Sequence, residues 1–451
     1  MAARLLALLL SAVLASCAFQ SYEAKPAPSA GDVARFDSRR IDEFGLREFM
    51  AERGDAQPEW PIREWRLLEL TLLALYYHPD IQVARERVEV ARAATVTAGR
   101  RPNPGLVSSA ASHSLRPNDE SPWTVGLQLE LPIVTAGKRE ARTERAQVGL
   151  EIARLDLADA AWRVRSRLRS RWLDYVAAAR AAELAETELG VRNELVGLLR
   201  ARLAAGAASA VEVANEEVRR AETERQFEHQ SGLAEVARSG LADALGLPVG
   251  AIARMTIALP DERSVSPIEA PETAREYALR NRLDVRRALL GYASAEADLK
   301  LEIARQYPDF TLRPGYSWDQ GDRIWSLALG LLLPVVDRNE GAILEAKARR
   351  ELAGQEFLAL QARVIGEVEG ALAGFRRARA ELELAERLRE TAGQRDADAE
   401  ARFAAGYVDR VQRASARLEL ASAQRAALES FGAAERAQGR LEDALQRPLD
   451  R

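Results

Sequence analysis

The sequence predicts a mainly α-helical protein that carries a small β-barrel. In this fold a long α-helical coiled-coil barrel continues into a 12-stranded transmembrane β-barrel, which a trimer forms with four strands from each protomer. The stretches between Pro132 and Pro248 and between Pro334 and Pro448 contain no proline and are rich in Ala, Leu, Arg and Glu, which favours very long helices. Landmark residues also recur about 200 positions apart, and each copy contains two short runs that alternate apolar and polar residues.

Composition and charge exclude several classes of function. The 451 residues include 64 Lys and Arg against 68 Asp and Glu, a net charge of −4, so no nucleic-acid partner is expected. Hydrophobic residues make up 47% and charged residues 29%, which is enough apolar material for a folded core. One Cys and three His are too few for a disulfide framework or a soft-metal site, and no nucleophile-base pair or phosphate loop occurs. We therefore expect no enzyme, no cofactor and no bound metal.

The N-terminus has the pattern of an export signal. Arg4 precedes an apolar run from Leu5 to Ala15, which is too short to span a bilayer and predicts a signal peptide over residues 1–16. Leu14-Ala15-Ser16-Cys17 resembles the bacterial lipobox, so Cys17 is the predicted lipidation site and residues 17–64 form a lipid-anchored extension. The alternative is an ordinary signal peptide followed by a chance cysteine. In lipoproteins of this type Asp after the cysteine favours the inner membrane, and Ala18 therefore indicates the outer membrane.

An internal duplication organises the rest of the chain. Ala74-Leu75 recurs as Ala278-Leu279, Leu131-Pro132 as Leu333-Pro334, and the Arg202 to Gly206 stretch as Arg402 to Gly406, always in the same order. A period of about 200 residues indicates a duplicated domain. We expect the first repeat at 65–255, a connector at 256–270 and the second repeat at 271–451.

Each repeat predicts the same series of elements. A helix (67–99 and 271–305) precedes the two strands, and a long helix (139–203 and 341–403) follows them. A glycine turn then leads into a return helix that ends near residue 245 or 445. The apolar seam expected along the second long helix has one polar break, at Arg379, and consists of Ile365, Val368, Leu372, Phe375 and Leu382.

The alternating runs predict strands with one apolar face. The residues expected to face lipid are Trp123, Val125, Leu127 and Leu129 in the first repeat, and Trp325, Leu327, Leu329 and Leu331 in the second. A soluble alternative is an amphipathic hairpin packed on helices. Four strands cannot close a barrel, and open sheet edges are not tolerated in lipid, so we expect a homotrimer with twelve strands.

Several motifs resemble one family. The double repeat and the stretches named below, in this order, are similar to those of the outer membrane efflux protein (TolC-like) family, from about Trp65 to the end. The stretches are Arg101-Pro-Asn-Pro104, Pro122-Trp-Thr-Val-Gly126, Leu131-Pro-Ile-Val-Thr-Ala-Gly-Lys-Arg139, Leu333-Pro-Val-Val-Asp-Arg338 and both Arg-x-Ala-Ala-Gly turns. The resemblance implies an outer membrane channel whose helices cross the periplasm and dock on a membrane fusion (adaptor) protein and an inner-membrane pump of the resistance-nodulation-division type. Gly137-Lys138-Arg139 and Gly406-Tyr-Val-Asp409-Arg410 look most like the heavy-metal (cobalt-zinc-cadmium type) resistance branch.

The candidate site residues lie where the long helices reverse. Arg202, Gly206, Arg402 and Gly406 predict helix termination, with glycine at positive φ, and by resemblance they form the tips that touch the adaptor. Glu212 and Asp409 either cap the return helices or form carboxylate rings that gate the closed end. Arg410, Gln412 and Arg413 depart from the family pattern, which leaves the packing of the second tip open.

The predicted function is passive conduction of substrates from the periplasm to the exterior, in a tripartite efflux system. The alternatives are a periplasmic coiled-coil structural lipoprotein and a type I secretion outer membrane channel. The sequence does not identify the substrate, since a channel requires only weak binding.

Overall fold

The computed structural model describes residues 20–25, 27, 31–53, 60–114, 121–258 and 270–449. The chain divides into two compact units, Met1–Arg40 and Ile41–Arg451. In the first unit the described structure is the short helix α2 (Gly31–Asp37), after which the Ser38 hydroxyl donates to the Arg35 carbonyl at 2.9 Å. The predicted lipidation site Cys17 and the signal peptide lie outside the described residues.

The second unit begins earlier than the first repeat was expected to. Helix α3 (Phe44–Arg53) places Leu46 and Met50 fully inside a core that also contains Trp65 and Leu70. Burial of these side chains stabilises α3 on the first repeat. Residues from Ile41 are therefore in the same compact unit as the repeats.

Both repeats contain two helices, two strands and two long helices in the same order, and the first repeat ends in an additional short helix. The first contains α4 (Leu67–Tyr77), α5 (Pro79–Gly99), β1 (Gly105–Ser112), β2 (Trp123–Ile133), α6 (Lys138–Ala204), α7 (Ala210–Leu245) and the short α8 (Val249–Ile252). The second contains α9 (Pro271–Asn281), α10 (Leu283–Ala304), β3 (Phe310–Asp319), β4 (Asp322–Leu331), α11 (Glu340–Ala404) and α12 (Arg410–Leu445). Among the described residues, no helix combines the length and the hydrophobicity that crossing a bilayer requires.

The helix expected before each pair of strands is in fact two helices. In the first repeat Pro79 disfavours the helical conformation at His78, which has ψ 127° and separates α4 from α5. Nδ1 of His78 accepts from the backbone N–H of Asp80 at 3.2 Å, so the His78 side chain caps the start of α5. In the second repeat no proline directly follows the break. The break at Arg282 is fixed by its guanidinium, which donates to Asp284, Glu367 and the carbonyl of Ala444. Sequence periodicity does not register such tertiary contacts.

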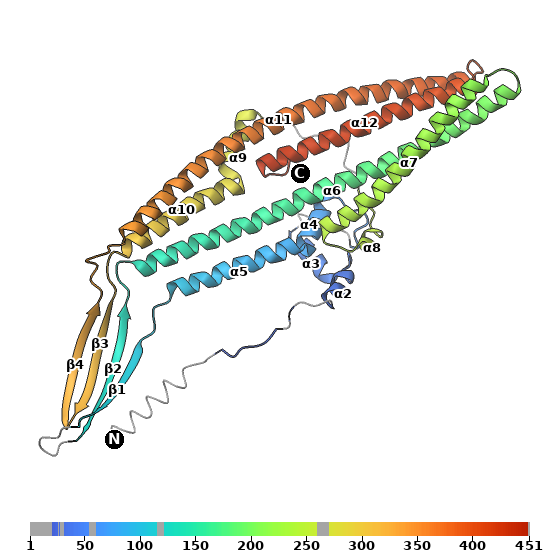
Figure 1. Ribbon diagram of the computed structural model, residues 1–451. Coiled ribbons are helices and arrows are strands. Elements are labelled where there is room, and N and C mark those ends of the chain that lie inside the picture. Colours follow the sequence, from blue (N-terminus) through green and yellow to red (C-terminus); the bar gives the residue numbers. More distant parts are fainter. Residues whose placement is uncertain are drawn as a thin grey trace. The chain divides into compact units, whose positions relative to one another are not determined.

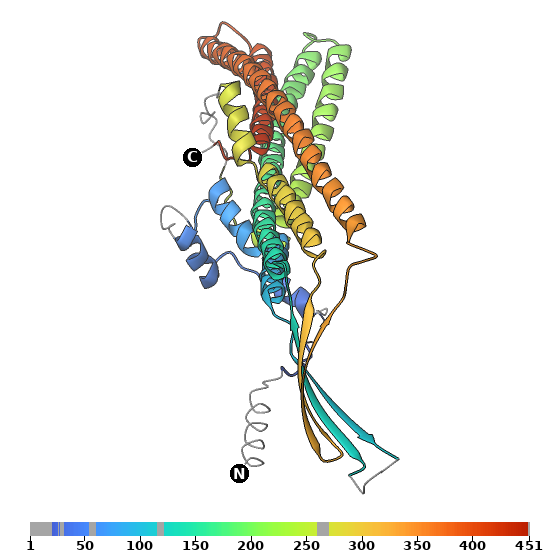
Figure 2. The same ribbon diagram turned by 90° about the vertical axis from the view of Figure 1, so that its left-hand side faces the viewer.

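The long helices lie side by side and the strands extend from one end of them (Figures 1 and 2). Helix α6 has 67 residues, about 100 Å at 1.5 Å per residue, and packs against α5, α7, α10 and α12. The second hairpin, α11 and α12, repeats the arrangement of α6 and α7. The two glycine turns lie at the end of the helices opposite the strands (Figure 1).

The seam of α11 follows a slightly different line from the predicted one. Its buried residues are Val364, Val368, Leu372, Phe375, Ala378 and Leu382, which pack with α12 and α9. Ala378 occupies the seam position that was expected for Arg379. Arg379 lies beside the seam and pairs with Glu383 at 3.7 Å, so the apolar stripe is continuous there.

The four strands form one antiparallel sheet in the order β1-β2-β3-β4. Antiparallel pairing continues across the repeat boundary, where β2 pairs with β3. The turn between β3 and β4 has Gln320 at φ 50° and Gly321 at φ 114°, and such positive-φ residues match the twist of a tight hairpin. Strands β1 and β4 are the two edges of the sheet.

Candidate functional site

One face of the sheet is apolar and exposed. Leu127 of β2 is paired with Tyr316 of β3, which is paired with Trp325 of β4, and the Tyr316 and Trp325 rings lie 4.8 Å apart. On β4, Trp325, Leu327 and Leu329 are 80%, 70% and 59% exposed. The other predicted lipid-facing residues share this exposure: Trp123, Val125, Leu127, Leu129 and Leu331.

The opposite face of the sheet is polar. Arg313 Nε lies 2.8 Å from Glu130 Oε1, and His113 Nε2 lies 3.4 Å from Asp319 Oδ1. The Thr124 hydroxyl also donates to Asp319. The period-2 pattern of the sequence therefore corresponds to a real segregation of apolar and polar side chains between the two faces.

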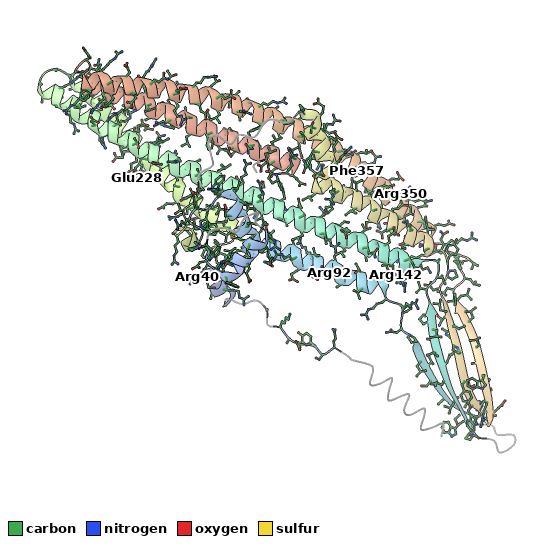
Figure 3. The ribbon with its side chains drawn as sticks, turned by 180° about the vertical axis from the view of Figure 1, so that it is seen from behind. Arg40, Arg92, Arg142, Glu228, Arg350 and Phe357 are labelled. Carbon is green, nitrogen blue, oxygen red and sulfur yellow. The ribbon has the colours of Figure 1, made fainter. Side chains whose placement is uncertain are left out.

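This apolar face has no partner within the described part of the chain. No strand packs against any of the described helices. The soluble alternative, in which the hairpins pack on helices, is therefore not the arrangement found. Along the helices, by contrast with the sheet, lie charged side chains such as Arg92, Arg142, Glu228 and Arg350 (Figure 3).

Polar contacts fix the point where the strands meet the helices. Lys138 is buried at the start of α6, and its Nζ donates to the Tyr307 carbonyl at 2.7 Å and to Asp309 Oδ1 at 2.8 Å. The backbone N–H of Thr135 donates to the same carboxylate oxygen at 2.9 Å. These bonds join the end of β2 to the start of β3, and so hold the two repeats together at the base of the sheet.

Both tip turns have the same geometry. Gly206 and Gly406 have φ values of 73° and 79°, as predicted for helix termination. In each turn the glycine N–H bonds to the carbonyl three residues earlier, and the next N–H bonds to the carbonyl of Arg202 or Arg402 at 2.8 Å. This is a Schellman motif, and it uses carbonyls that the helix end would leave without donors.

The return helices begin with capping boxes. The backbone N–H of Glu212 donates to the Ser209 hydroxyl at 3.2 Å, and the Glu212 carboxylate accepts from the Ser209 N–H at 2.7 Å. In the second repeat Asp409 Oδ1 accepts from the N–H groups of Val411 and Gln412 at 2.8 and 2.9 Å. Both gate candidates therefore cap helices, and Gln412 completes the second box by accepting from the N–H of Asp409.

Asp409 makes an additional contact across the repeats. Its second carboxylate oxygen forms an ion pair with Arg202, so two of the predicted residues meet at the tips. The hydrogen bond from the N–H of Gln412, together with the contact with Arg202, holds the pKa of Asp409 below its ordinary value. These effects outweigh the opposing effect of its burial. Hydrogen bonds from Ser209 lower the pKa of Glu212 in the same direction. Arg402 pairs instead with Asp398 of its own helix at 3.0 Å.

Ion pairs that the sequence did not predict join the two helical hairpins near the tips. Arg413 stacks on the Phe403 ring at 4.3 Å and lies 3.0 Å from Glu194 of α6 and 3.6 Å from Glu400 of α11. The polar residues at the start of α12 therefore have defined partners. The relevant sequence signal is a cation three to four residues beyond the helix N-cap, facing acidic positions of two other helices.

A buried polar seam joins α6 to α12 further from the tips. Glu442 is 1% exposed and pairs with Arg165 at 2.6 Å and with Arg169 at 3.6 Å. Gly439 makes room for this seam, because a Cβ atom there would lie 2.6 Å from Arg169 Nη1. A glycine inside a long helix is the signal that could have indicated close approach.

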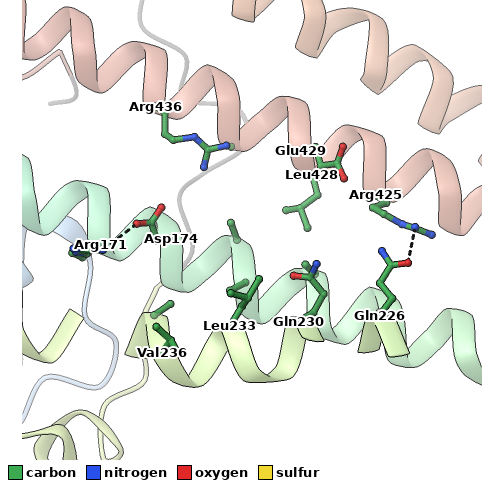
Figure 4. Close-up of a pocket in the computed structure, with 16 residues that line it drawn as sticks. Arg171, Asp174, Gln226, Gln230, Leu233, Val236, Arg425, Leu428, Glu429 and Arg436 are labelled. Atoms are coloured by element: carbon green, nitrogen blue, oxygen red, sulfur yellow. Dashed lines mark hydrogen bonds and ion pairs between the residues drawn. The ribbon is translucent and has the colours of Figure 1, made fainter. Parts of the chain in front are cut away.

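A groove of about 430 Å³ lies between α6, α7 and α12 (Figure 4). Ala177, Ala181 and Leu233 form part of its apolar wall, and Arg425 and Arg436 of α12 line its rim. None of the predicted tip, gate or strand residues lines it.

The chain belongs to the outer membrane efflux protein family, whose model matches residues 70–247 and 274–446. This is a class of outer membrane proteins and not of enzymes. The chain is similar to the cobalt-zinc-cadmium resistance protein CzcC of Cupriavidus metallidurans, with 28% identity over 53% of this chain and 57% of CzcC. The chain thus spans little more than half the length of that relative. The pyoverdine export outer membrane protein OpmQ of Pseudomonas aeruginosa is 26% identical over 69% of this chain and 70% of OpmQ.

Among solved structures, the outer membrane protein VceC of Vibrio cholerae has the same fold. The TM-score is 0.67 at 21% identity, covering 85% of this chain and 97% of VceC. The family resemblance predicted from the sequence is therefore confirmed.

Proposed function

We propose that three copies of this chain form the outer membrane channel of a tripartite efflux system, which conducts substrates passively from the periplasm to the exterior. The observation that carries this proposal is the sheet. Its apolar face is exposed and packs on no described helix, and no described strand pairs with its two edges. Lipid favours such a face, but every backbone group within the bilayer must be paired. A second copy supplies the missing pairing.

The strand order supports closure by more than one chain. All neighbouring strands are antiparallel, so β1 and β4 run in opposite directions at the two edges. The β4 edge of one copy therefore meets the β1 edge of the next in the same antiparallel sense, and rotation can close the ring. Three copies give twelve strands, which lies within the range of membrane barrels.

The helices support the same assembly. Helix α6 packs against α4, α5, α7, α10 and α12, whereas α11 packs, among the described elements, against α9, α10 and α12 only. In the duplication α10 and α12, which pack on α6, correspond to α5 and α7. The two neighbours that α11 lacks would therefore be α5 and α7 of the next copy. Exposed apolar residues lie on these helices: Leu344, Leu352, Leu358, Leu384 and Leu388 on α11, Val83, Val90 and Val96 on α5, and Val211, Val218 and Val236 on α7. Contact between these flanks would cover them.

The tips are the proposed docking site for the adaptor. They lie at the end of the helices remote from the strands and expose the two Schellman turns around Gly206 and Gly406. The Arg202–Asp409 pair joins the two tips of one protomer, which supports a role in keeping this end closed. Glu212 contributes by fixing the start of α7.

We further propose that the mature chain begins at an acylated Cys17 and is anchored in the outer membrane. Acyl chains contribute about 0.8 kcal/mol per buried CH₂, so several of them on one cysteine hold the N-terminus firmly. Intact-mass measurement of membrane-extracted protein should give a chain that starts at Cys17 with acyl groups attached. An unmodified N-terminus at another residue would exclude the anchor.

The pump partner we propose is of the resistance-nodulation-division type, with a substrate of the heavy-metal class. The similarity to the cobalt-zinc-cadmium resistance protein CzcC supports this choice over a type I secretion channel.

Conductance in planar lipid bilayers tests the proposed function against a structural lipoprotein. The purified protein should conduct ions, and Asp409→Ala should raise the conductance because it removes the pair with Arg202. Asp398→Ala is the matched control, since Asp398 pairs only within α11 through Arg402. A structural coiled coil would insert without conducting in any of the three proteins.

A further inference from the structure

The edge strand β4 is followed by an apolar segment that no described element covers. Strand β4 ends at Leu331, and the next apolar residues Leu332, Leu333, Val335 and Val336 are 69–97% exposed. An unpaired edge that continues into exposed apolar residues is a site for strand addition. The partner can be identified from the duplication.

The two repeats predict which residues such a partner would pair. Trp123 of β2 corresponds to Trp325 of β4, an offset of 202, and Pro104 before β1 corresponds to Pro308 before β3, an offset of 204. These offsets can be checked within one chain. Adding 204 to Ser108 and 202 to Leu127 converts this observed β1–β2 pair into Leu312–Leu329, which is an observed β3–β4 pair.

The same offsets convert the contact between repeats into a contact between copies. The offset of 202 is added to the β2 residue and the offset of 204 is subtracted from the β3 residue. The observed β2–β3 pairs Leu127–Tyr316 and Leu131–Leu312 then become the β4–β1 pairs Leu329–Ser112 and Leu333–Ser108. Strand β2 continues to Ile133, whose equivalent is Val335, four residues beyond the end of β4. Pro334 is no obstacle, because the equivalent Pro132 lies inside β2 and is paired with Thr311.

We propose that β4 lengthens to Val335 when it adds to the β1 edge of a second copy, with Leu333 opposite Ser108 and Leu329 opposite Ser112. The inference rests on the proposed trimer and specifies its strand register. This register places Leu329 and Leu333 on the same face as their partners, since Ser108 is opposite the outward-facing Leu127 in its own hairpin. A slip by one residue would bring the apolar face of one chain next to the polar face of the other.

Cysteine crosslinking in membranes tests this register. The only natural cysteine is Cys17, so the double variant Leu333→Cys with Ser108→Cys carries two new thiols. Oxidation or a short bifunctional thiol reagent should link one chain to the next and yield crosslinked dimers and trimers on a non-reducing gel. Linkage within one chain is excluded, because β1 and β4 lie three strand spacings apart, about 14 Å.

The matched control is Leu333→Cys with Ser112→Cys, in which the second thiol is four residues further along β1, about 13 Å from the proposed partner. Each single variant measures the background from Cys17. Crosslinking of the first pair and not of the control supports the register. Efficient crosslinking of the control overturns the register. If neither pair crosslinks in a protein that still migrates as a trimer, the register is also overturned, but the proposed trimer is not. A monomer in mild detergent overturns the proposed assembly, and the register with it.

Discussion

Gly439 lets α12 approach α6 closely enough for Arg169 to lie between Glu435 and Glu442. Arg169 and Glu442 are almost completely buried, and a buried ion pair is costly to disturb because it leaves an uncompensated charge. The glycine therefore has a packing role in a helix that would otherwise favour alanine.

Gly439→Ala is expected to destabilise the protein by about 1–3 kcal/mol, because its Cβ would displace the Arg169 guanidinium. Gly370→Ala in α11 is the control, since a Cβ there meets nothing within 4 Å. That change should instead stabilise the helix, by about 1 kcal/mol at most. Thermal unfolding of the purified variants measures both, and equal midpoints would show that the seam tolerates a larger side chain.

The ion pair between Arg202 and Asp409 should depend on pH in one direction only. The pKa of Asp409 is lower in the folded protein than in an unfolded chain, so its contribution is present above the ordinary aspartate pKa, about 3.9. The contribution is lost as the pH falls below that value and through the lowered pKa. We expect conductance in planar bilayers to be constant from about pH 8 to pH 5, and to rise below about pH 4. A rise between pH 7 and pH 5 would assign the closed state to another group.

At the scale of the elements, the tips combine a Schellman turn with a capping box in both repeats. Gly206 and Gly406 have open space around the position of a Cβ, so the requirement for glycine comes from φ alone.

Gly406→Val should therefore impose backbone strain of about 1–3 kcal/mol at the tip without disturbing the core. We expect loss of efflux-dependent resistance in cells, with trimer content and outer membrane level unchanged. Gly366→Val, at a position within α11 that is also open, controls for the added side chain. Normal resistance and normal adaptor crosslinking in both variants would show that the adaptor contacts another part of the helices.

The long helices and the strands could be predicted from sequence because their periods are long and regular. The observed bounds of α6 and α11 differ from the predicted ones by one residue at each end. The glycine turns followed from local backbone preference. The break at Arg282, the seam position of Ala378 and the network around Arg413 could not be predicted, because each depends on helices that are distant in sequence. The burial of Leu46 and Met50 against α4 and Trp65 could not be predicted for the same reason.

For the whole molecule, membrane insertion requires that lipid and not water covers the apolar face of the sheet. Leu127→Arg should reduce barrel stability in the membrane by about 2–4 kcal/mol if the side chain lies at mid-bilayer. The adjacent Gln128→Arg lies on the polar face and should have a much smaller effect. The fraction of protein inserted and folded in lipid vesicles measures the difference, and equal insertion of both variants would argue against a lipid-facing Leu127.

The most direct test of the assembly is electron cryo-microscopy of the purified protein in lipid nanodiscs. The proposed trimer predicts a threefold-symmetric tube with one barrel of twelve strands, in which β4 of each chain lies next to β1 of its neighbour. A particle in which the four strands of each chain stay separate, or pack on their own helices, would contradict it.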